Sequence, residues 1–127
     1  MRRIMYVENK HGGLDGDGRI GWVEVSRTAR MYHYRGRHLM KTRRGYKYNC
    51  IDEENGDIYW VSGPRKDGAD KLYGGVVQID DDARVEYWTK IRCQPALVAM
   101  TEYRAGASTR TEGRTRQNDP RRSRTRG

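Results

Sequence analysis

The sequence predicts a mainly β fold with one helix, an α+β domain around an antiparallel sheet. Three observations support this prediction. Short segments rich in β-branched and aromatic residues alternate with glycine-rich stretches, the pair Asn55-Gly56 separates two such segments, and helical periodicity appears once, after residue 82. Short strands with glycine-rich turns are typical of a small closed sheet. We therefore expect an SH3-like barrel, with an OB-like barrel or a strongly curved sheet as the close alternative.

The first half of the chain is expected to contain three strands. A β-type run at 4–7 is followed by a loop at 11–18, where four of eight residues are glycine. Residues 19–25 alternate in polarity as a strand does, and Ser26-Arg27-Thr28 can turn the chain into a return strand at 29–34. A basic loop is expected at 35–45.

The second half is expected to contain a hairpin, one more strand and the helix. Residues 46–52 and 57–62 flank the turn at Asn55-Gly56, a pair that favours tight hairpins. The stretch 63–68 should turn the chain, and 75–80 should form a strand. A helix is expected over 83–92, capped by Asp80, Asp81 and Asp82. Its apolar stripe is expected to be Val85, Trp88 and Ile91. Pro95 should end the helix, and residues 96–100 should pack back on the core.

A chain of 127 residues makes one domain at most. Beyond Tyr103 no large apolar residue occurs, so we expect a compact domain over 1–103 and a disordered, arginine-rich tail over 104–127. No run of about 18 apolar residues is present that could span a membrane, and no signal peptide is apparent. Cys50 and Cys93 are therefore expected to be reduced thiols, and we expect a cytoplasmic protein.

Positive charge is segregated along the chain. Residues 25–51 contain eight basic side chains and no acidic one, whereas residues 52–103 contain six basic and eleven acidic side chains. A field of this kind attracts polyanions. A competing explanation is the base composition of the coding DNA, because arginine outnumbers lysine by 20 to 6.

Aromatic side chains lie among these cations and could stack on bases. Met31 is the more apolar choice for the core, so we expect Tyr32 and Tyr34 to form an exposed platform, and Tyr46 and Tyr48 to point inward. The candidate site for nucleic acid or another anion is Arg30, Tyr32, Tyr34, Arg35, Arg37, Lys41, Arg43, Arg44 and Lys47. Tail residues expected to add electrostatic affinity are Arg110, Arg114, Arg116, Arg121, Arg122, Arg124 and Arg126.

Catalytic and metal-binding patterns are not found. The three histidines have no evident nucleophile partner, and no GxSxG, HExxH, Walker or complete EF-hand pattern occurs. Gly16-Asp17-Gly18 with Asn49 imitates half of a thiamine-diphosphate motif, but enzymes of that type need two large domains. We therefore expect no enzyme activity, no metal and no cofactor.

Several segments together resemble a family of short, uncharacterised bacterial proteins of unknown function. The segments are 3–10, 18–23, 32–37, 59–68 and 86–92, so the resemblance covers roughly residues 3–95. It implies a bacterial, cytoplasmic origin and no particular activity.

The sequence favours a non-enzymatic module that binds RNA or single-stranded DNA with low sequence specificity. About six phosphate contacts would give a log–log salt slope near −4 to −5. This hypothesis requires the cations of the basic block to share one surface without neighbouring carboxylates. One alternative is a protein-interaction module that docks an acidic partner, with Tyr59 or Trp60 as an exposed anchor. Another is a small enzyme that holds an anionic substrate at residues 62–68 beside His33 or His38.

Overall fold

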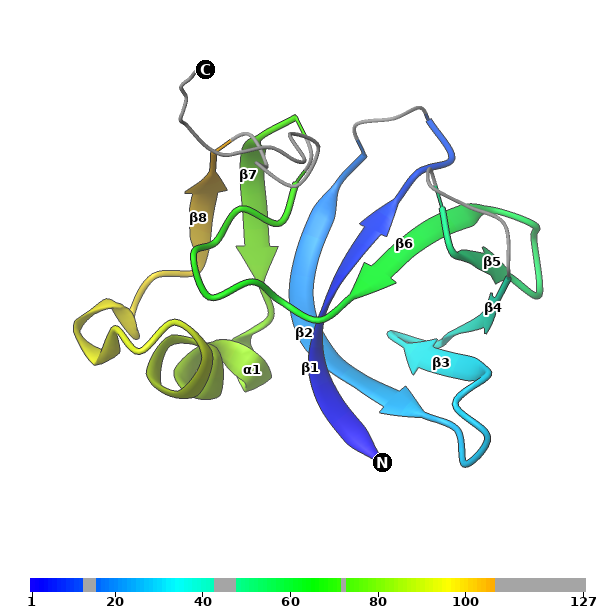
Figure 1. Ribbon diagram of the computed structural model, residues 1–127, viewed down its shortest axis with the longest axis horizontal. Coiled ribbons are helices and arrows are strands. Elements are labelled where there is room, and N and C mark those ends of the chain that lie inside the picture. Colours follow the sequence, from blue (N-terminus) through cyan, green and yellow to red (C-terminus); the bar gives the residue numbers. More distant parts are fainter. Residues whose placement is uncertain (13–15, 43–47, 72, 107–127) are drawn as a thin grey trace, which may run out of the picture.

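In the part of the chain that the structure describes, six strands close into an antiparallel barrel, and a smaller lobe packs beside it (Figure 1). The computed structural model describes residues 1–12, 16–42, 48–71 and 73–106. The barrel strands are β1 (Arg2–Asn9), β2 (Gly18–Val25), β3 (Met31–Tyr34), β4 (Arg37–Lys41), β5 (Cys50–Asp52) and β6 (Ile58–Ser62). They follow one another around the barrel, and β1 closes it by pairing with both β2 and β6. This confirms the small antiparallel barrel that the sequence predicts.

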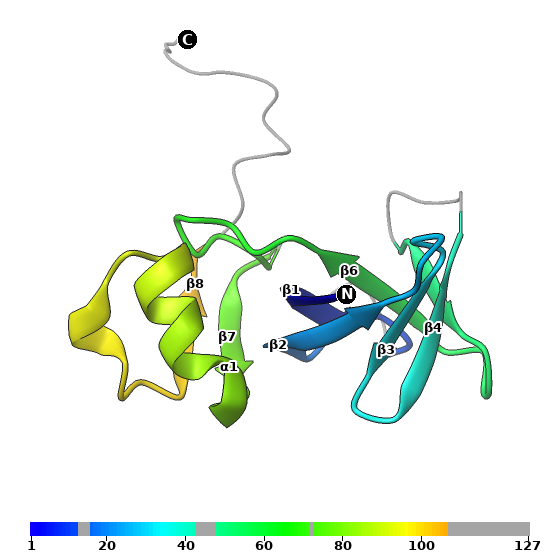
Figure 2. The same cartoon turned by 90° about the horizontal axis from the view of Figure 1, so that it is seen from below.

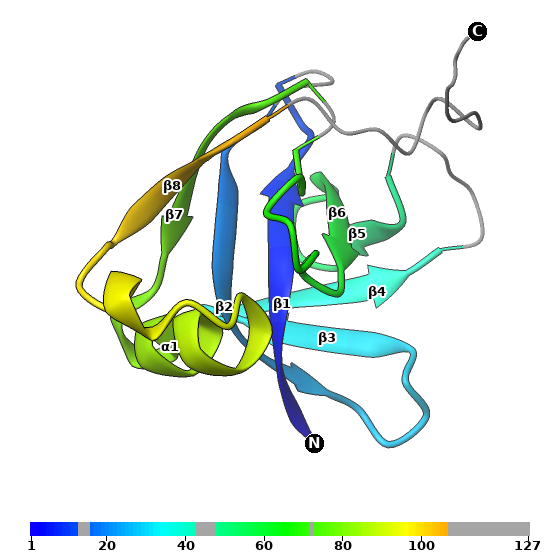
Figure 3. The ribbon, with the colours of Figure 1, turned by 60° about the vertical axis from the view of Figure 1, so that its left-hand side comes forward.

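The second lobe consists of β7 (Gly75–Ile79), β8 (Glu102–Ala105) and the helical segment between them. β7 pairs in parallel with the start of β2, and β8 pairs antiparallel with β7, so that β8, β7, β2 and β1 lie side by side (Figure 3). The helical segment comprises α1 (Asp81–Glu86), the π-helical turn η1 (Tyr87–Ile91) and the 3₁₀ turn η2 (Pro95–Leu97). Figure 2 shows this lobe on one side of the molecule and the β3–β4 hairpin on the other.

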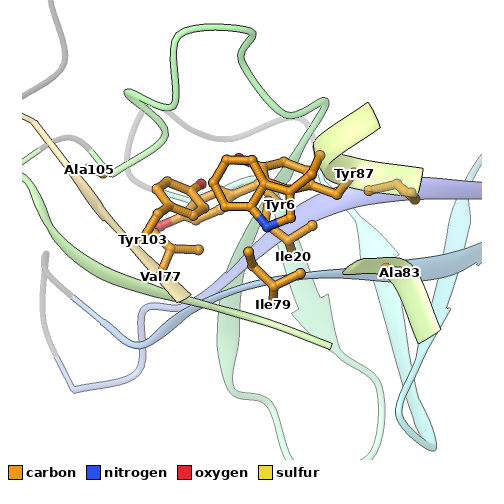
Figure 4. Close-up of a cluster of buried hydrophobic side chains, with 10 residues drawn as sticks. Tyr6, Ile20, Val77, Ile79, Ala83, Tyr87, Tyr103 and Ala105 are labelled. Carbon is orange, nitrogen blue, oxygen red and sulfur yellow. The ribbon is translucent and has the colours of Figure 1, made fainter. Parts of the chain in front are cut away.

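The strands β1 and β2 separate two hydrophobic cores, and β1 therefore buries both of its faces. Because side chains alternate along a strand, Met5 and Val7 point into the barrel, while Ile4 and Tyr6 face the second lobe. Figure 4 shows the second core, where aromatic rings from β1, η1 and β8 pack over the aliphatic side chains of β2 and β7. The inner core of the barrel contains three tyrosines in a chain that has no phenylalanine: Tyr32, Tyr34 and Tyr59.

The predicted Asn-Gly hairpin is confirmed. Residues 53–57 connect β5 to β6, Gly56 has a φ of +80°, and the Asp52 amide donates to the Asp57 carbonyl over 2.8 Å. The predicted first strand, the strand at 19–25 and the strand at 75–80 are also present as β1, β2 and β7.

The structure corrects several boundaries. The expected basic loop contains the strand β4, since Arg35-Gly36 is a two-residue turn between Tyr34 and Arg37. The strand expected at 46–52 begins only at Cys50, as β5, and Tyr46 and Lys47 lie outside the described part of the chain. β8 ends at Ala105, two residues past the expected domain boundary, and residues 107–127 lie outside the described part of the chain.

The apolar stripe predicted for the helix is confirmed at Trp88 and Ile91, which pack in or against the second core, and was wrong at Val85. Val85 is 57% exposed, whereas Ala83, Tyr87 and Trp88 are buried. The helix begins at Asp81 rather than at 83, and the change to π-helical winding at Tyr87 rotates the following side chains relative to an α-helix. The buried face therefore does not follow the full i, i+3, i+6 spacing that the sequence suggests.

Candidate functional site

The mouth of the barrel at the β3–β4 turn is a recess of about 330 Å³. Its lining comes from the ends of five strands and from the turn itself. The lining residues are Val7, Asn9, Asp17, Arg19, Tyr34, Arg35, Arg37 and Tyr59. Barrel mouths are a common place for ligand sites, and this one gathers three guanidinium groups around two tyrosine hydroxyls. It is therefore the first candidate site.

The β3–β4 turn places two of these arginines at the mouth. Arg35 and Gly36 both have positive φ, 49° and 79°, as a type I′ hairpin turn requires. Glycine tolerates this conformation, whereas an arginine in it costs about 1 kcal/mol. The strained turn directs the Arg35 side chain into the recess beside Arg37, the first residue of β4.

Asp80 joins the arginines of the mouth to the second lobe. One carboxylate oxygen accepts from Arg19 Nε at 3.1 Å, from Arg19 Nη2 at 2.8 Å and from Arg35 Nη1 at 3.4 Å. The other accepts from the Tyr34 hydroxyl at 2.6 Å. Burial, together with the neighbouring carboxylate, raises the pKa of Tyr34, so this phenol remains protonated. Asp80 precedes α1, but its side chain does not cap the helix as predicted.

Gly21 makes the approach of Tyr34 to Asp80 possible. A Cβ atom at this position of β2 would lie 2.3 Å from Asp80 Oδ2 and 2.7 Å from a ring carbon of Tyr34. No side chain larger than hydrogen fits without displacing this pair. A glycine within a strand often marks such a close approach.

A second carboxylate, that of the buried Asp52, holds Arg37. Its Nη1 donates to Asp52 Oδ2 over 3.0 Å, and Asp52 is only 1% exposed. Asp52 also accepts from the Glu54 amide at 2.9 Å. Burial opposes ionisation of Asp52, but the amide and guanidinium hydrogen bonds outweigh it and lower the pKa. The hydrogen bond that Arg37 donates to this carboxylate raises the pKa of Arg37.

The formal charge of the mouth is close to neutral. Three arginines are opposed by Asp52 and Asp80, which hold them, and by the exposed Asp17 in the lining. The site therefore offers oriented N–H donors rather than a strong positive field.

A larger recess of about 690 Å³ adjoins the mouth on the side of the second lobe. Three of its lining residues, Arg19, Tyr34 and Arg35, also line the mouth. The others are Trp22, Gln78, Ile79, Asp80, Asp81, Asp82 and Thr101. Trp22 is half-buried, its indole N–H donates to the Asp82 carbonyl, and the Arg2 guanidinium lies 4.5 Å from the ring centroid. The two recesses together present three arginines, four aspartates and the rings of Trp22, Tyr34 and Tyr59.

The predicted tyrosine platform was wrong. Tyr32 and Tyr34 are 8% and 6% exposed and belong to the core of the barrel, while Met31 and His33 on the opposite face of β3 are partly exposed. The barrel interior takes the large aromatic side chains because no phenylalanine is available to fill it. Tyr48, which was expected to point inward, is partly exposed.

The predicted cations do not all lie together. Arg35 and Arg37 are at the mouth, each beside a carboxylate, so the required surface without neighbouring acids is not formed there. Arg30 and Lys41 are exposed at the other end of β3 and β4, where the Lys41 ammonium lies 5.6 Å from the Tyr32 ring centroid. The remaining candidates lie outside the described residues: Arg43, Arg44, Lys47, Arg110, Arg114, Arg116, Arg121, Arg122, Arg124 and Arg126.

Sequence reasoning missed Arg19 and Asn9 as site residues, and it gave Tyr59 and Asp80 other roles, as a surface anchor and a helix cap. Arg19 and Asp80 are 61 positions apart and meet because β7 runs parallel to the start of β2. The glycine in the middle of β2 was the one local indication of a close approach.

The other sequence-based candidates find little support. Tyr59 is 5% exposed and cannot be a surface anchor, and Trp60 packs partly against the second core. His38 lines a small pocket together with Glu53 and Glu54, and among the residues that the structure describes this pocket does not include any of 62–68. Within the described ranges, no three His, Cys, Asp or Glu side chains are placed to hold a metal ion.

Comparison with protein-family models, with curated proteins and with solved structures finds no match to this chain. Among the described residues, no helix has the length and apolar character needed to cross a membrane.

Proposed function

We propose that this protein is a non-enzymatic module that binds single-stranded nucleic acid, RNA or DNA, through phosphate groups at the barrel mouth. The supporting observation is that the guanidinium groups of Arg19, Arg35 and Arg37 line one recess. Their side chains are 37%, 57% and 46% exposed, so a phosphate can reach them from solvent. Guanidinium N–H groups match the geometry of phosphate oxygens and can bind them in pairs.

The carboxylates of Asp52 and Asp80 support this function by orienting the arginines. Arg35 and Arg37 each use a single terminal nitrogen in these contacts, so most of their donors point elsewhere. A guanidinium that is already held in place loses less conformational entropy when a ligand binds. The same carboxylates reduce the net charge, so binding at the mouth relies on a few well-directed hydrogen bonds.

The number of phosphate contacts at the mouth is small. Three arginines on a recess of this size can engage about two phosphates, which contributes about −1.4 to the log–log salt slope for a single strand. The broad basic surface expected from the sequence would contribute −4 to −5. Charge in the tail adds to the slope of the full chain, so the mouth is best tested by comparing variants.

The test uses the full-length chain and a fluorescent pool of RNA about 20 nucleotides long, with anisotropy measured from about 50 to 300 mM salt. Arg35→Asn removes the cation and suits the positive φ of the turn, so the barrel should fold normally. We expect this variant to bind about fivefold to tenfold more weakly, with a slope smaller by about 0.7. The matched control is Arg30→Asn, which removes an exposed arginine at the other end of β3 and should bind as wild type does.

Equal affinities for wild type and Arg35→Asn, or no RNA binding at low salt, would refute the proposal. An acidic protein partner would depend on the same arginines. In that case a partner would remain bound after nuclease treatment and would be lost with Arg35→Asn.

A further inference from the structure

Core side chains close the barrel mouth from below, and the mouth continues on one side into the larger recess, with which it shares Arg19, Tyr34 and Arg35. Its lining includes Val7, Tyr34 and Tyr59, which belong to the packed core of the barrel and are 3%, 6% and 5% exposed. These side chains form a floor beneath the arginines. A strand that passed through the site would need an open channel with two exits, as nucleic-acid grooves have.

The donors at the mouth come from several directions. Arg19 lies on β2, Arg35 in the β3–β4 turn and Arg37 on β4. The Tyr59 hydroxyl accepts from the Asn9 amide at 3.3 Å, which leaves its own proton to donate. Burial raises the pKa of Tyr59 and keeps that proton in place.

This arrangement suits a terminal phosphate better than an internal one. A phosphomonoester has a charge of about −1.5 to −2 at neutral pH and three strong acceptor oxygens, whereas an internal phosphodiester has one charge and two free oxygens. Donors that reach a recess from three different elements can contact all three oxygens of an end group. Building on the proposed function, we propose that the barrel mouth binds the phosphorylated end of a single strand.

The adjoining recess is placed to hold the terminal nucleotide. It shares Arg19, Tyr34 and Arg35 with the mouth and adds the half-buried ring of Trp22 and the polar side chains of Gln78 and Thr101. It also contains three carboxylates, Asp80, Asp81 and Asp82. Asp80 is paired with Arg19 and Arg35, and Asp81 with Arg84, so the base and sugar, rather than the phosphate, suit this side of the site. Its volume of about 690 Å³ is within the usual range for small-molecule sites. The phosphate would lie at the arginines, and the sugar and base would extend toward Trp22.

Asp17 allows a test in which the substitution should strengthen binding rather than weaken it. Its exposed carboxylate is the only acid among the described residues that line the mouth, and it would repel a bound phosphate. Asp17→Asn should therefore tighten binding of a phosphorylated end by about threefold to tenfold and leave a hydroxyl end almost unchanged. A purely structural role for Asp17 would not separate the two ends.

The main experiment is a competition assay with the full-length chain and single strands of one sequence that differ only at their ends. Four competitor strands are compared: one with a 5′-phosphate, one with a 3′-phosphate, one with hydroxyl groups at both ends, and one that is a covalently closed circle. We expect one phosphorylated form to compete about 10-fold to 100-fold better than the hydroxyl and circular forms. Because the second phosphate pKa is about 6, this preference should grow between pH 5.5 and 7.5. Arg35→Asn should abolish the preference, and Arg30→Asn should retain it.

Three results would overturn the inference in different ways. Hydroxyl-ended and circular strands that bind as tightly as phosphorylated ones, with all of them weakened by Arg35→Asn, would leave nucleic-acid binding in place and reject recognition of an end. No binding of any strand at low salt would reject both proposals. A nucleoside monophosphate that competes as well as the phosphorylated strand would show that the ligand is a free nucleotide and would also reject recognition of a chain end.

Discussion

Replacing Tyr34 by phenylalanine tests whether the Tyr34–Asp80 contact stabilises the mouth. The substitution removes a hydroxyl that donates to Asp80 Oδ2 over 2.6 Å and leaves the aromatic ring in the core. A hydrogen bond to a charged group contributes about 1.5–3 kcal/mol. Asp80 retains its bonds from Arg19 and is 10% exposed, so water can partly replace the lost donor. We therefore expect a loss of about 1.5–2 kcal/mol in the free energy of unfolding.

Tyr59→Phe is the matched control in the same core. Tyr59 is as buried as Tyr34, but its hydroxyl makes a longer, 3.3 Å contact with the neutral Asn9 amide. Its loss should cost about 0.5–1 kcal/mol. Urea unfolding of both variants, with unchanged m-values, measures the difference. A cost for Tyr34→Phe equal to or below that for Tyr59→Phe would contradict the assigned role of the Asp80 contact.

The pH dependence gives a second readout of the same contact. Burial and the Asp80 carboxylate raise the pKa of Tyr34 above 10 in the folded state. At higher pH the unfolded chain loses this proton first, so the folded state binds more protons and stability falls as pH rises. Each retained proton contributes a slope of about 1.4 kcal/mol per pH unit. Above pH 10, Tyr34→Phe should therefore lose stability less steeply than wild type, although other buried tyrosines contribute to both curves.

Three further predictions concern the barrel and its turns. Gly21→Ala should destabilise the fold by about 1–3 kcal/mol in urea unfolding, because the new methyl group displaces the Asp80 carboxylate. A variant as stable as wild type would contradict the close approach of Tyr34 and Asp80 at this position. Gly56→Ala should lower the free energy of unfolding by about 1–2 kcal/mol, because alanine disfavours the positive φ of the hairpin turn. An unchanged denaturation midpoint would contradict this turn conformation. Burial raises the pKa of Cys50 to about 12, so at pH 8 a thiol reagent should modify the exposed Cys93 and leave Cys50 unmodified until the chain unfolds. Rapid modification of both thiols in the folded protein would contradict the buried position of Cys50.

The fold was predictable where local chemistry determines it. Asn55-Gly56 predicted its hairpin because glycine readily adopts the positive φ that Gly56 has in this turn. The inward face of β3 was not predictable from its own residues, because both faces contain large, partly apolar side chains. Only the closed barrel, with Val23, Leu39 and Val61 around the same interior, determines that the tyrosines point inward. β1 presents the same difficulty, since it is buried on both faces and shows no alternation.

The charge pattern was misleading for a topological reason. The basic block and the acidic segment after it are separate in sequence, but β4 pairs with β5, which places Asp52 beside Arg37. The parallel pairing of β7 with β2 likewise places Asp80 beside Arg19 and Arg35.

Separation of charges along the chain therefore does not produce a separate positive surface at the mouth. Under the proposed function, recognition at the mouth depends on the direction of the N–H donors, and a ligand must fit the recess to benefit from them. Long-range attraction by net charge would bind every strand alike and would weaken uniformly with salt. Directed donors predict a preference among strands of equal charge that persists as salt is raised, and the competition between linear and circular strands separates these two modes.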